Sequence, residues 1–505
     1  MIEEAQQSYQ WEQPERQSPV AILLILFQFV TKLIKQFWPF LIIIFFRQGS
    51  SSSDSAYFEA FALVLGLGST LASIISYFKF YFYVKGEELV IEKGIFQKVK
   101  LNIPFERIQT ISFQQNLIHQ FFNVVSLEID TAGSKGKEFS ILALKKEKAE
   151  AIRNFLIAQI PVTKDNEGEE TDQEVQEAVV EETLLQLSLK DLLKIGVGQN
   201  HLRGLGIIVA AIFALAEIVD TGKKGFVRGL FEFFNKGKET LSDTIIWIYL
   251  TPTLIVFLLL TSFVMTFLNY YDLRFLKTTK GFKVIAGLLN RKEQSAAMQK
   301  IQMIEWTTNP LKKIFEMYDI RLLQASSAAL RKKQSFYVPG CYEEQLQSVR
   351  QAYMPKEASV EFESHGINRR IINKRVMLIG LLPLIPFSIS QFLRTGSISV
   401  QLFLWTALVI VTSYIYWKRY RYFVSEEGIR IQKGIFVTKY TLLKYYKIQG
   451  AVITQSIFQQ RNGYANLKIF TAAGNVRIPY IELEKAQALM DVLLWKVESS
   501  KKGWM

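Results

Sequence analysis

Adjacent carboxylates are the residues of this chain that come closest to a catalytic pattern. Three such pairs occur, at Glu87-Glu88, Glu343-Glu344 and Glu426-Glu427. Two carboxylates held close together could divide the roles of general acid and general base. The first and third pairs share one position in two similar segments, in a short turn where adjacent side chains point to opposite sides. We interpret these two pairs as solvated turns and predict no catalytic residue among the carboxylates.

Metal, thiol and phosphate chemistry have equally little support. The chain has one cysteine, Cys341, and three histidines, His119, His201 and His365. A single thiol cannot form a disulfide framework or a thiolate metal cluster. No glycine-rich phosphate loop, His-Glu-x-x-His or Gly-x-Ser-x-Gly segment occurs, and we expect His119 to be a packed or interface residue. The sequence therefore predicts a protein that is not an enzyme and needs no metal or cofactor.

Basic residues outnumber acidic ones, with a net charge of +14. From residue 418 to the end there are fifteen Lys or Arg and six Asp or Glu. Such a surplus can attract anionic headgroups, at about 1 kcal/mol per base near the surface, bind nucleic acid, or only orient membrane spans. A domain tethered to a membrane meets lipid first, so we expect anionic lipid and no nucleic acid as partner. The bases expected at the inner leaflet are Arg369, Arg370, Lys374, Arg375, Lys418, Arg419 and Arg421.

A repeated segment must position these residues. Lys93-Gly94-Ile95-Phe96 recurs as Lys433-Gly434-Ile435-Phe436, and Ile108-Gln109 recurs at the same offset as Ile448-Gln449. A fainter middle copy places Gly287-Leu288-Leu289 and Ile301-Gln302 in the same positions. An internal repeat decides the fold interpretation before any other feature. We therefore divide the chain into copies one, two and three.

Within a copy, short alternating runs separated by turn residues predict antiparallel strands. Gly94, Gly287 and Gly434 are expected at a turn that requires positive φ. Gly463 and Gly474 mark further tight turns in copy three. After Pro479, apolar residues recur at helical spacing. A copy is therefore predicted to be several strands followed by one amphipathic helix.

Copy three contains a series of residues in fixed order. They are Ile448-Gln449, Gln455, Gln460-Arg461, Gly463, a Thr-Ala-Ala-Gly turn that ends at Gly474, and Ile478-Pro479 before the predicted helix. Copy one keeps Gln115 and Gln120 but has Phe121 and Asn123 where copy three has Arg461 and Gly463, and copy two has Gln324-Ala325-Ser326-Ser327 at the turn. This pattern resembles the bacterial PH-like domain, also called the membrane-flanked domain. The resemblance implies three PH-like α+β domains, each an antiparallel sheet or barrel with a C-terminal helix.

The resemblance also concerns function and partners. Three copies with six apolar spans are similar to a type of protein usually found beside a smaller one-copy relative. The resemblance implies a role in envelope integrity or in resistance to membrane-active antimicrobial peptides, in complex with that small PH-like membrane protein. From the residues alone, Gln115, Gln120, Gln455, Gln460 and Arg461 either line a partner or lipid site or satisfy irregular backbone.

Apolar runs between the copies predict the rest of the architecture. The expected fold class is a mixed membrane protein with six transmembrane helices and three PH-like domains. The predicted segments are a polar N-terminus (1–18), an interfacial helix with spans one and two (19–79), PH-like domain one (80–160), an acidic linker (161–183), an interfacial helix with spans three and four (184–271), PH-like domain two (272–353), a linker (354–375), spans five and six (376–417) and PH-like domain three (418–498). Residues 19–35 could instead span the membrane.

Basic residues gather where the runs meet the domains, and the positive-inside rule makes that side cytoplasmic. We expect a multi-pass protein of the cell inner membrane with both termini in the cytoplasm. Short tethers also predict that the three domains pack against one another, with copy two in a packing role.

Two hypotheses of function follow. The first is a non-enzymatic membrane scaffold whose cytoplasmic PH-like domains bind a partner protein or the inner leaflet. The alternative is a device that exports or handles lipids or peptides through a six-helix bundle. Intramembrane charges, which a transporter usually needs, are scarce: Glu217 and Asp220 are the only acids close to the interior of a predicted span.

Overall fold

The structure is a computed structural model of the 505-residue chain. The residues that it describes are 11–32, 67–95, 97–131, 139–159, 182–199, 256, 259–279, 281–324, 336–355, 364–396 and 400–500.

Each copy consists of two three-stranded halves joined by a short 3-10 turn. We call the three strands before the turn the front half and the three after it the rear half. In copy one the front half is β1 (Tyr81–Lys85), β2 (Glu88–Lys93) and β3 (Val99–Pro104), the turn is η1 (Phe105–Arg107), and the rear half is β4 (Ile108–Asn116), β5 (Val124–Thr131) and β6 (Phe139–Lys145). Helix α4 (Lys146–Gln159) ends the copy.

Copies two and three follow the same order. Copy two has β8 (Arg274–Thr278), β9 (Gly281–Ala286) and β10 (Asn290–Ala297), then η3 (Met298–Lys300), then β11 (Ile301–Thr308), β12 (Tyr318–Gln324), β13 (Phe336–Cys341) and α10 (Glu343–Tyr353). Copy three has β15 (Arg421–Val424), β16 (Gly428–Lys433) and β17 (Thr438–Lys444), then η6 (Tyr445–Lys447), then β18 (Ile448–Thr454), β19 (Tyr464–Thr471), β20 (Gly474–Glu482) and α15 (Leu483–Glu498). The strand and helix pattern predicted for a copy is present in all three.

A short extended segment precedes each copy and pairs with its first strand. β7 (Glu182–Gln186) pairs with β8, β14 (Ser364–Gly366) pairs with β15, and in copy one Glu15 forms a single bridge with Phe82. Helices α5 (Leu189–Val197) and α11 (Arg370–Arg375) follow the two strands. The repeated unit is therefore longer than the strands and helix of one copy.

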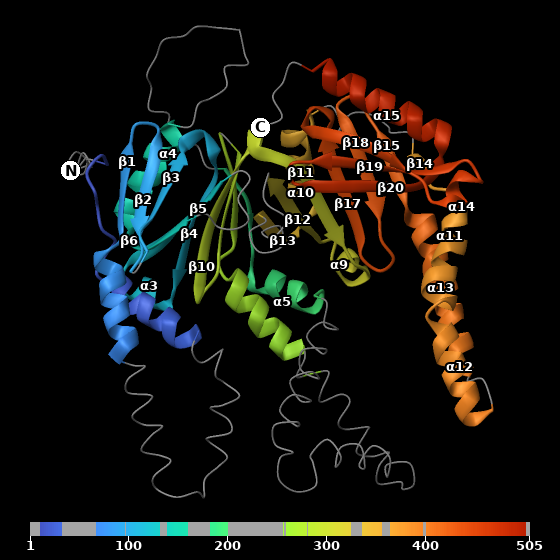
Figure 1. The fold of residues 1–505 in the computed structure, drawn as a ribbon, viewed down its shortest axis with the longest axis horizontal. Helices are drawn as coiled ribbons and strands as arrows, with labels where there is room; N and C mark the ends of the chain where they lie inside the picture. Colours follow the sequence, from blue (N-terminus) through green and yellow to red (C-terminus); the bar gives the residue numbers. More distant parts are fainter. Residues whose placement is uncertain are drawn as a thin grey trace, which may run out of the picture.

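The sheets run from one copy into the next. The rear half of copy one joins the front half of copy two through β4 and β10, and the rear half of copy two joins the front half of copy three through β11 and β17. Each junction completes a seven-stranded antiparallel sheet that ends in β7 or β14 (Figure 1). The predicted packing of the copies is thus present between copies one and two and between copies two and three, and a copy is not a self-contained sheet or barrel.

Both junctions use the same register. Glu293 faces Phe113 across the first junction, and the residues at the corresponding repeat positions, Tyr440 and Trp306, face each other across the second. The side chains differ. Arg153 of α4 contacts Glu293 at 2.6 Å in the first junction, whereas the rings of Trp306 and Tyr440 stack at 5.1 Å in the second. The backbone pairing is thus the repeated feature.

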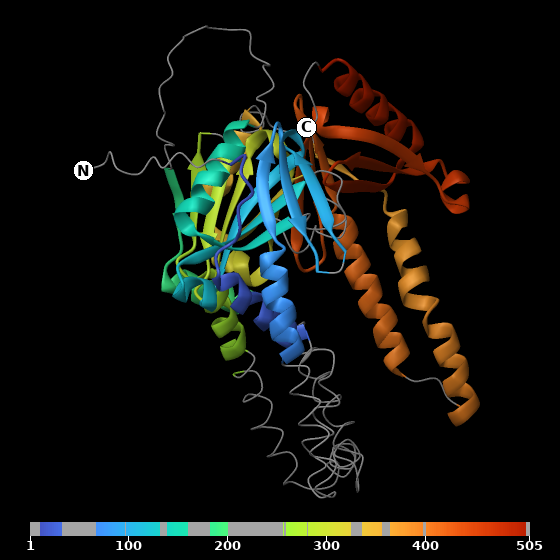
Figure 2. The ribbon, with the colours of Figure 1, turned by 60° about the vertical axis from the view of Figure 1, so that its left-hand side comes forward.

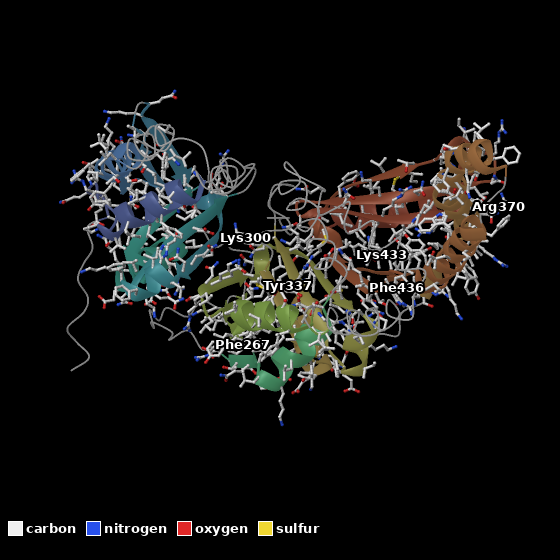
Figure 3. The ribbon with its side chains drawn as sticks, turned by 90° about the horizontal axis from the view of Figure 1, so that it is seen from below. Phe267, Lys300, Tyr337, Arg370, Lys433 and Phe436 are labelled. Carbon is white, nitrogen blue, oxygen red and sulfur yellow. The ribbon has the colours of Figure 1, made fainter. Side chains whose placement is uncertain are left out.

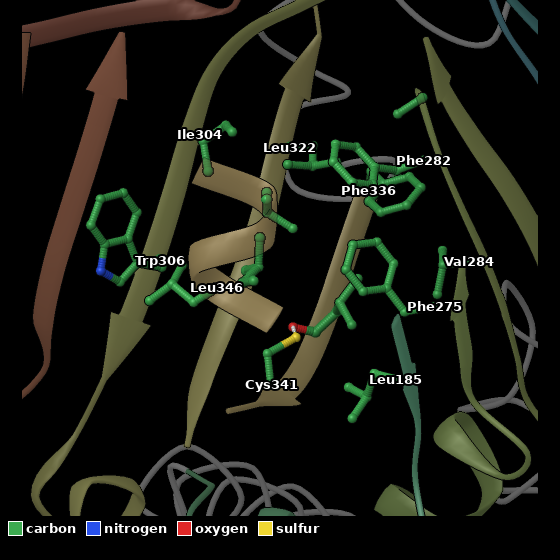
Figure 4. Close-up of a cluster of buried hydrophobic side chains, with 14 of the residues drawn as sticks. Leu185, Phe275, Phe282, Val284, Ile304, Trp306, Leu322, Phe336, Cys341 and Leu346 are labelled. Atoms are coloured by element: carbon green, nitrogen blue, oxygen red, sulfur yellow. Dashed lines mark hydrogen bonds between the residues drawn. The ribbon is translucent and has the colours of Figure 1, made fainter. Parts of the chain in front are cut away.

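The hydrophobic core crosses the second junction. The buried cluster of copy two contains Phe275, Phe282 and Phe336 of its strands and also Leu442 of copy three. Figure 4 shows the aromatic rings of this cluster between β-strands and α10, with Cys341 among them. Because Cys341 is fully buried, its pKa is raised by desolvation.

The turn glycines have the conformation that the sequence predicts. Gly94, Gly287 and Gly434 have φ of 122°, 111° and 139°. A Cβ added at any of them would lie within 2.3 Å of a carbonyl oxygen three residues on. Gly463 and Gly474 also have positive φ, at 68° and 140°. The turns at Gly94, Gly287 and Gly434 therefore require glycine for both conformation and space, whereas at Gly463 the conformation alone favours it.

A second turn position shows the same constraint with different residues. Gly463, Asn123 and Glu316 occupy the same place in their copies and have φ of 68°, 49° and 57°. Glycine adopts this left-handed conformation freely and asparagine tolerates it, whereas a glutamate is strained there.

The predicted count of membrane spans is wrong for the part of the chain that the structure describes. One helix, Arg370–Leu393, is long and apolar enough to cross a membrane, with 24 residues and a mean hydropathy of 2.0. Three other apolar helices, Val20–Lys32, Leu67–Phe78 and Leu259–Tyr270, are shorter than the about 20 residues a bilayer requires. The rest of the predicted first four spans lies outside the described residues, so the six-helix fold class has to be corrected.

The long helix and the next one leave copy three together. It includes α11, a π-helical turn (Val376–Leu381) and α12 (Leu384–Thr395), and α13 (Val400–Arg419) leads back into copy three. Figure 2 shows α12 and α13 side by side, extending away from the sheets. We call the side from which they project the helix side.

The strained turn generates a first prediction. Replacing Glu316 with glycine should stabilise the chain by about 1 kcal/mol, because the left-handed conformation costs a residue with a Cβ roughly 1–2 kcal/mol. The measurement is the apparent melting temperature of the purified full chain in detergent. Glu344→Gly, within helix α10, serves as control and should lower the melting temperature.

Lys447 at the second junction generates a prediction about pH. Lys447 is 2% exposed, and its ammonium donates a hydrogen bond to the Gln299 carbonyl of copy two at 2.6 Å. Burial, with Lys444 and Lys300 nearby, lowers the pKa of Lys447 to about 8. Between that value and the ordinary pKa of 10.5, the unfolded chain binds the proton that the folded chain has lost. The contribution of Lys447 to stability therefore rises with pH in this window.

Between pH 7.5 and 9.5 the wild type should gain about 2 kcal/mol relative to Lys447→Met. Apparent melting temperatures at both pH values measure this gain. Lys145→Met, which removes an exposed lysine, reports the background. A gap between wild type and Lys447→Met that stays constant with pH would contradict the prediction.

Candidate functional site

Three short helices stand at corresponding places in the three copies, each between the first two strands of a rear half. They are α3 (Leu117–Phe121), α9 (Pro310–Ile314) and α14 (Ile457–Gln460). α3 and α9 lie on the helix side of the sheets, and α14 lies beside α11 at the base of the long helix (Figure 1). We call the exposed residues of these helices and of the adjacent hairpin tips the helix-side surface.

The sequence starts each short helix in the same way. Asn116, Asn309 and Ser456 occupy one repeat position, and each side-chain oxygen accepts a hydrogen bond from a backbone N–H three residues on. Such a cap satisfies a backbone donor that a helix start leaves unpaired. The capping residue thus fixes where each helix begins and which side chains point outward.

Those outward side chains are apolar. Phe121 is 84% exposed, Ile314 74% and Phe458 70%. Further exposed apolar residues on these helices and the hairpin tips are Leu117, Phe122, Leu289, Leu311, Phe436, Val437 and Ile457. Exposed apolar groups that gather on one side of a protein mark a surface made to meet another apolar phase or a partner. Sequence reasoning missed this surface, although the repeated cap followed by apolar residues is visible in all three copies.

A cavity of about 530 Å³ opens between copies two and three. Its lining includes two cations, Lys313 of α9 and Arg419 at the end of α13, and the apolar side chains of Ile314 and Phe436. Arg419 Nη1 donates to the Ile435 carbonyl oxygen at 2.5 Å, which holds the guanidinium at the hairpin tip. Phe436 is labelled in the view from below (Figure 3). The cavity therefore combines positive charge with an apolar rim.

The bases predicted at the inner leaflet lie near the foot of the long helix, and several contact aromatic rings. The cation-to-ring distances are 4.4 Å for Arg375 over Tyr416, 5.9 Å for Arg369 over Trp417, 5.5 Å for Arg370 over Tyr464 and 5.5 Å for Lys374 over Tyr480. These contacts fix the long helix against α13 and copy three. Arg419 lines the cavity, Lys418 is exposed, and Arg421 begins β15 beside β14.

The glutamines singled out from the sequence have separate roles. Gln115 and Gln455, at one repeat position, each donate to a backbone carbonyl of their own copy, at 3.1 and 2.8 Å. Gln120 donates to the Leu288 carbonyl across the first junction at 3.0 Å. Its counterpart Gln460 is exposed, and its side chain makes no hydrogen bond within the described part of the chain. Arg461, which follows it, is exposed at the end of α14.

The residues considered for catalysis are accounted for by local structure. His119 is buried, with its ring nitrogens at hydrogen-bond distance from Asn116 Oδ1 and the Leu142 carbonyl, and burial lowers its pKa. Glu88 accepts a hydrogen bond from Asn102, and Glu343-Glu344 begin α10. In the described ranges no group of three or more His, Cys, Asp or Glu side chains could hold a metal ion.

A buried ion pair holds α9 in place. Lys312 contacts Asp319 of β12, both side chains are buried, and Asp319 also accepts a hydrogen bond from the Gly340 amide at 3.3 Å. A buried pair of this kind contributes little in itself, but removing one partner leaves an uncompensated charge. The pair therefore ties the cavity-lining helix to the sheet.

The fold and this surface define a chain of repeated PH-like domains, and comparison agrees. The family model described as Bacterial PH domain matches residues 22–160, 226–357 and 377–496. The chain therefore belongs to the bacterial PH domain family, which confirms the resemblance seen in the sequence.

The relatives are membrane proteins by name. The chain is 22% identical over 479 residues to the UPF0699 transmembrane protein YdbT of Bacillus subtilis (strain 168), which covers 92% of this chain and 93% of that protein. A stretch of 74 residues is 36% identical to the UPF0699 transmembrane protein YdbS of the same organism, which is 15% of this chain and 46% of that protein. No solved structure matches the chain.

Breaking the buried ion pair should destabilise the chain. We expect Lys312→Met to lower stability by about 3–5 kcal/mol, because Asp319 would keep a buried charge without a partner. Lys312→Met combined with Asp319→Leu should recover most of the loss. Apparent melting temperatures of the two variants in detergent measure the difference, and equal melting temperatures would show that the pair is not coupled.

Proposed function

We propose that this protein is a non-enzymatic scaffold of the cell inner membrane whose PH-like domains lie in the cytoplasm and bind the inner leaflet and partner proteins. The observation that carries the proposal is the helix-side surface, where exposed apolar residues recur in all three copies on the side from which the long helix projects. The name of the YdbT relative, a transmembrane protein, supports the location.

The physical argument begins with the long helix. A membrane span that starts at Arg370 holds copy three close to the headgroups. Exposed side chains such as Phe436 and Phe458 then face the interface, where burial of apolar area stabilises binding. The helix side of the domains is thereby the side that meets lipid.

The cavity between copies two and three suits an anionic headgroup. Lys313 and Arg419 provide the positive charge, and Ile314 and Phe436 provide an apolar rim for the beginning of an acyl chain. Arginine also presents a planar set of donors that matches a phosphate group. Because Arg419 lines the cavity and Lys418 precedes it at the end of α13, both residues would contact the inner leaflet when the cavity holds a headgroup.

The proposal also includes a partner protein and a physiological role. A smaller PH-like membrane protein is the proposed partner; the family resemblance supports it, and the 36% identity to YdbS shows only that part of this chain is similar to a second transmembrane protein. The role in envelope integrity or resistance to antimicrobial peptides rests on the family resemblance. The export device considered from the sequence depended on a six-helix pathway, and the described residues contain one helix long enough to cross a membrane.

Depth-dependent quenching tests the lipid contact. The full chain carrying Phe436→Cys, labelled with an environment-sensitive dye, is reconstituted into liposomes with and without anionic lipid. We expect quenching by spin-labelled lipids, because Phe436 lies on the helix-side surface. Val492→Cys, at an exposed position of α15, is the matched control and should stay unquenched. Equal quenching at both sites would contradict the proposal.

Two further measurements complete the test. Lys313→Gln combined with Arg419→Gln should reduce the difference between anionic and neutral liposomes, since both cavity charges are removed. Reporter fusions at Gly136 and Gly474 should read as cytoplasmic. An external signal at either position would overturn the proposed topology.

A further inference from the structure

The two ends of the array each leave a strand edge open. β3 is the outer strand of the sheet β1-β2-β3, and β18 is the outer strand of the sheet β18-β19-β20. In the described part of the chain each of these strands pairs on one side only. Their counterparts in the other copies are the strands that form the two junctions, β10 and β17 from front halves and β4 and β11 from rear halves.

We propose that β18 of one chain pairs with β3 of a second copy of this chain, so that the chains close into a ring of PH-like domains. The chain already makes this front-to-rear contact twice. An open edge of backbone N–H and C=O groups is a template for another strand. The partner that fits each end is therefore the opposite end of the same protein.

The shared register of the two junctions predicts the register of the third. Glu293 faces Phe113 at the first junction, and Tyr440 faces Trp306 at the second. At the open ends, Lys100 of β3 corresponds to Glu293 and Tyr440, and Ile453 of β18 corresponds to Phe113 and Trp306. Lys100 of one chain should therefore face Ile453 of the other. The neighbouring pair is Leu101 facing Val452.

The side chains at the ends match each other. At the second junction Lys439 and Glu305, on adjacent strands, form an ion pair at 2.5 Å. The corresponding residues at the open ends are Val99 and Val452, which are 44% and 46% exposed. Across the proposed junction Val452 lies directly opposite Leu101 and diagonally opposite Val99, so all three side chains are on one face of the sheet. Apolar cross-strand pairs of this kind stabilise a sheet. An apolar edge thus meets an apolar edge.

A polar contact repeats as well. Gln120 donates to the Leu288 carbonyl across the first junction. The corresponding pair at the open ends is Gln460, whose side chain has no hydrogen-bond partner among the described residues, and the Ile95 carbonyl of the second chain. Gln460 is therefore placed to donate a hydrogen bond across the proposed junction, as Gln120 does across the first junction.

The arrangement of the copies agrees with closure. Viewed from below, copies one and three lie at the two ends of an arc with copy two between them (Figure 3). A head-to-tail contact closes into a ring when the rotation at each contact adds up to a full turn. Since the long helix projects from the helix side in every chain, the ring axis must run along the helices. This inference does not depend on lipid binding.

Crosslinking tests the contact directly. Two full-length chains with different tags are expressed together, one with Leu101→Cys and the other with Val452→Cys, and oxidised in native membranes. Residues that face each other across antiparallel strands have Cα atoms about 5 Å apart, within reach of a disulfide. We expect a disulfide between the differently tagged chains. Cys341 is buried in both and stays unreacted.

The control moves one cysteine a strand inward. Leu101→Cys with Lys468→Cys on β19 places the two Cα atoms about 10 Å apart, beyond disulfide reach, so no product is expected. No product from Leu101→Cys with Val452→Cys, with both chains inserted, would overturn the proposal. So would a disulfide that forms only within one chain when that chain carries both cysteines.

Counting subunits gives a second readout. Single-molecule photobleaching of the full chain in lipid nanodiscs should show at least two copies per particle. Val452→Lys places a charge opposite Leu101 and beside Val99, within the apolar contact, and should shift the population to single copies, whereas Val492→Lys on α15 should leave it unchanged. One copy of the wild-type chain per particle would refute self-pairing. The same holds if that single copy is bound to a smaller PH-like protein instead of a second copy.

Discussion

The pairing of each front half with the rear half before it is the constraint on which the structure depends. A 3-10 turn of three residues separates the two halves of a copy and sends them into different sheets. Each half alone would expose an edge of unpaired backbone groups. Pairing across copies satisfies those groups at β4·β10 and β11·β17, and it also merges the core of copy two with Leu442 of copy three. Cooperativity between copies is therefore built into the sheets.

The sequence predicts those parts of the fold that depend on local conformation. Gly94, Gly287 and Gly434 mark their turns because positive φ and lack of space are properties of a few consecutive residues. Strand alternation likewise shows which side chains are buried. It does not show which strand lies alongside, since any strand with the right pattern could occupy that place. The shared sheets could therefore not be derived from periodicity.

The candidate site was hidden for a related reason. Helices α3, α9 and α14 have four or five residues, which is too few to show a 3.6-residue hydrophobic period. The only sequence signal for them is the N-cap residue, Asn116, Asn309 or Ser456. The span count failed differently. Charge-free runs measure composition, whereas a span also requires a continuous helix of sufficient length, and among the described residues Arg370–Leu393 is the helix that has both.

The position of copy two explains why its sequence has drifted furthest from the repeat. Its front half and its rear half are both held by neighbours, so it contributes strands to both seven-stranded sheets. A turn that has lost Thr-Ala-Gly and a strained Glu316 are tolerated where pairing on both sides supplies stability. Copies one and three each have one half without such support.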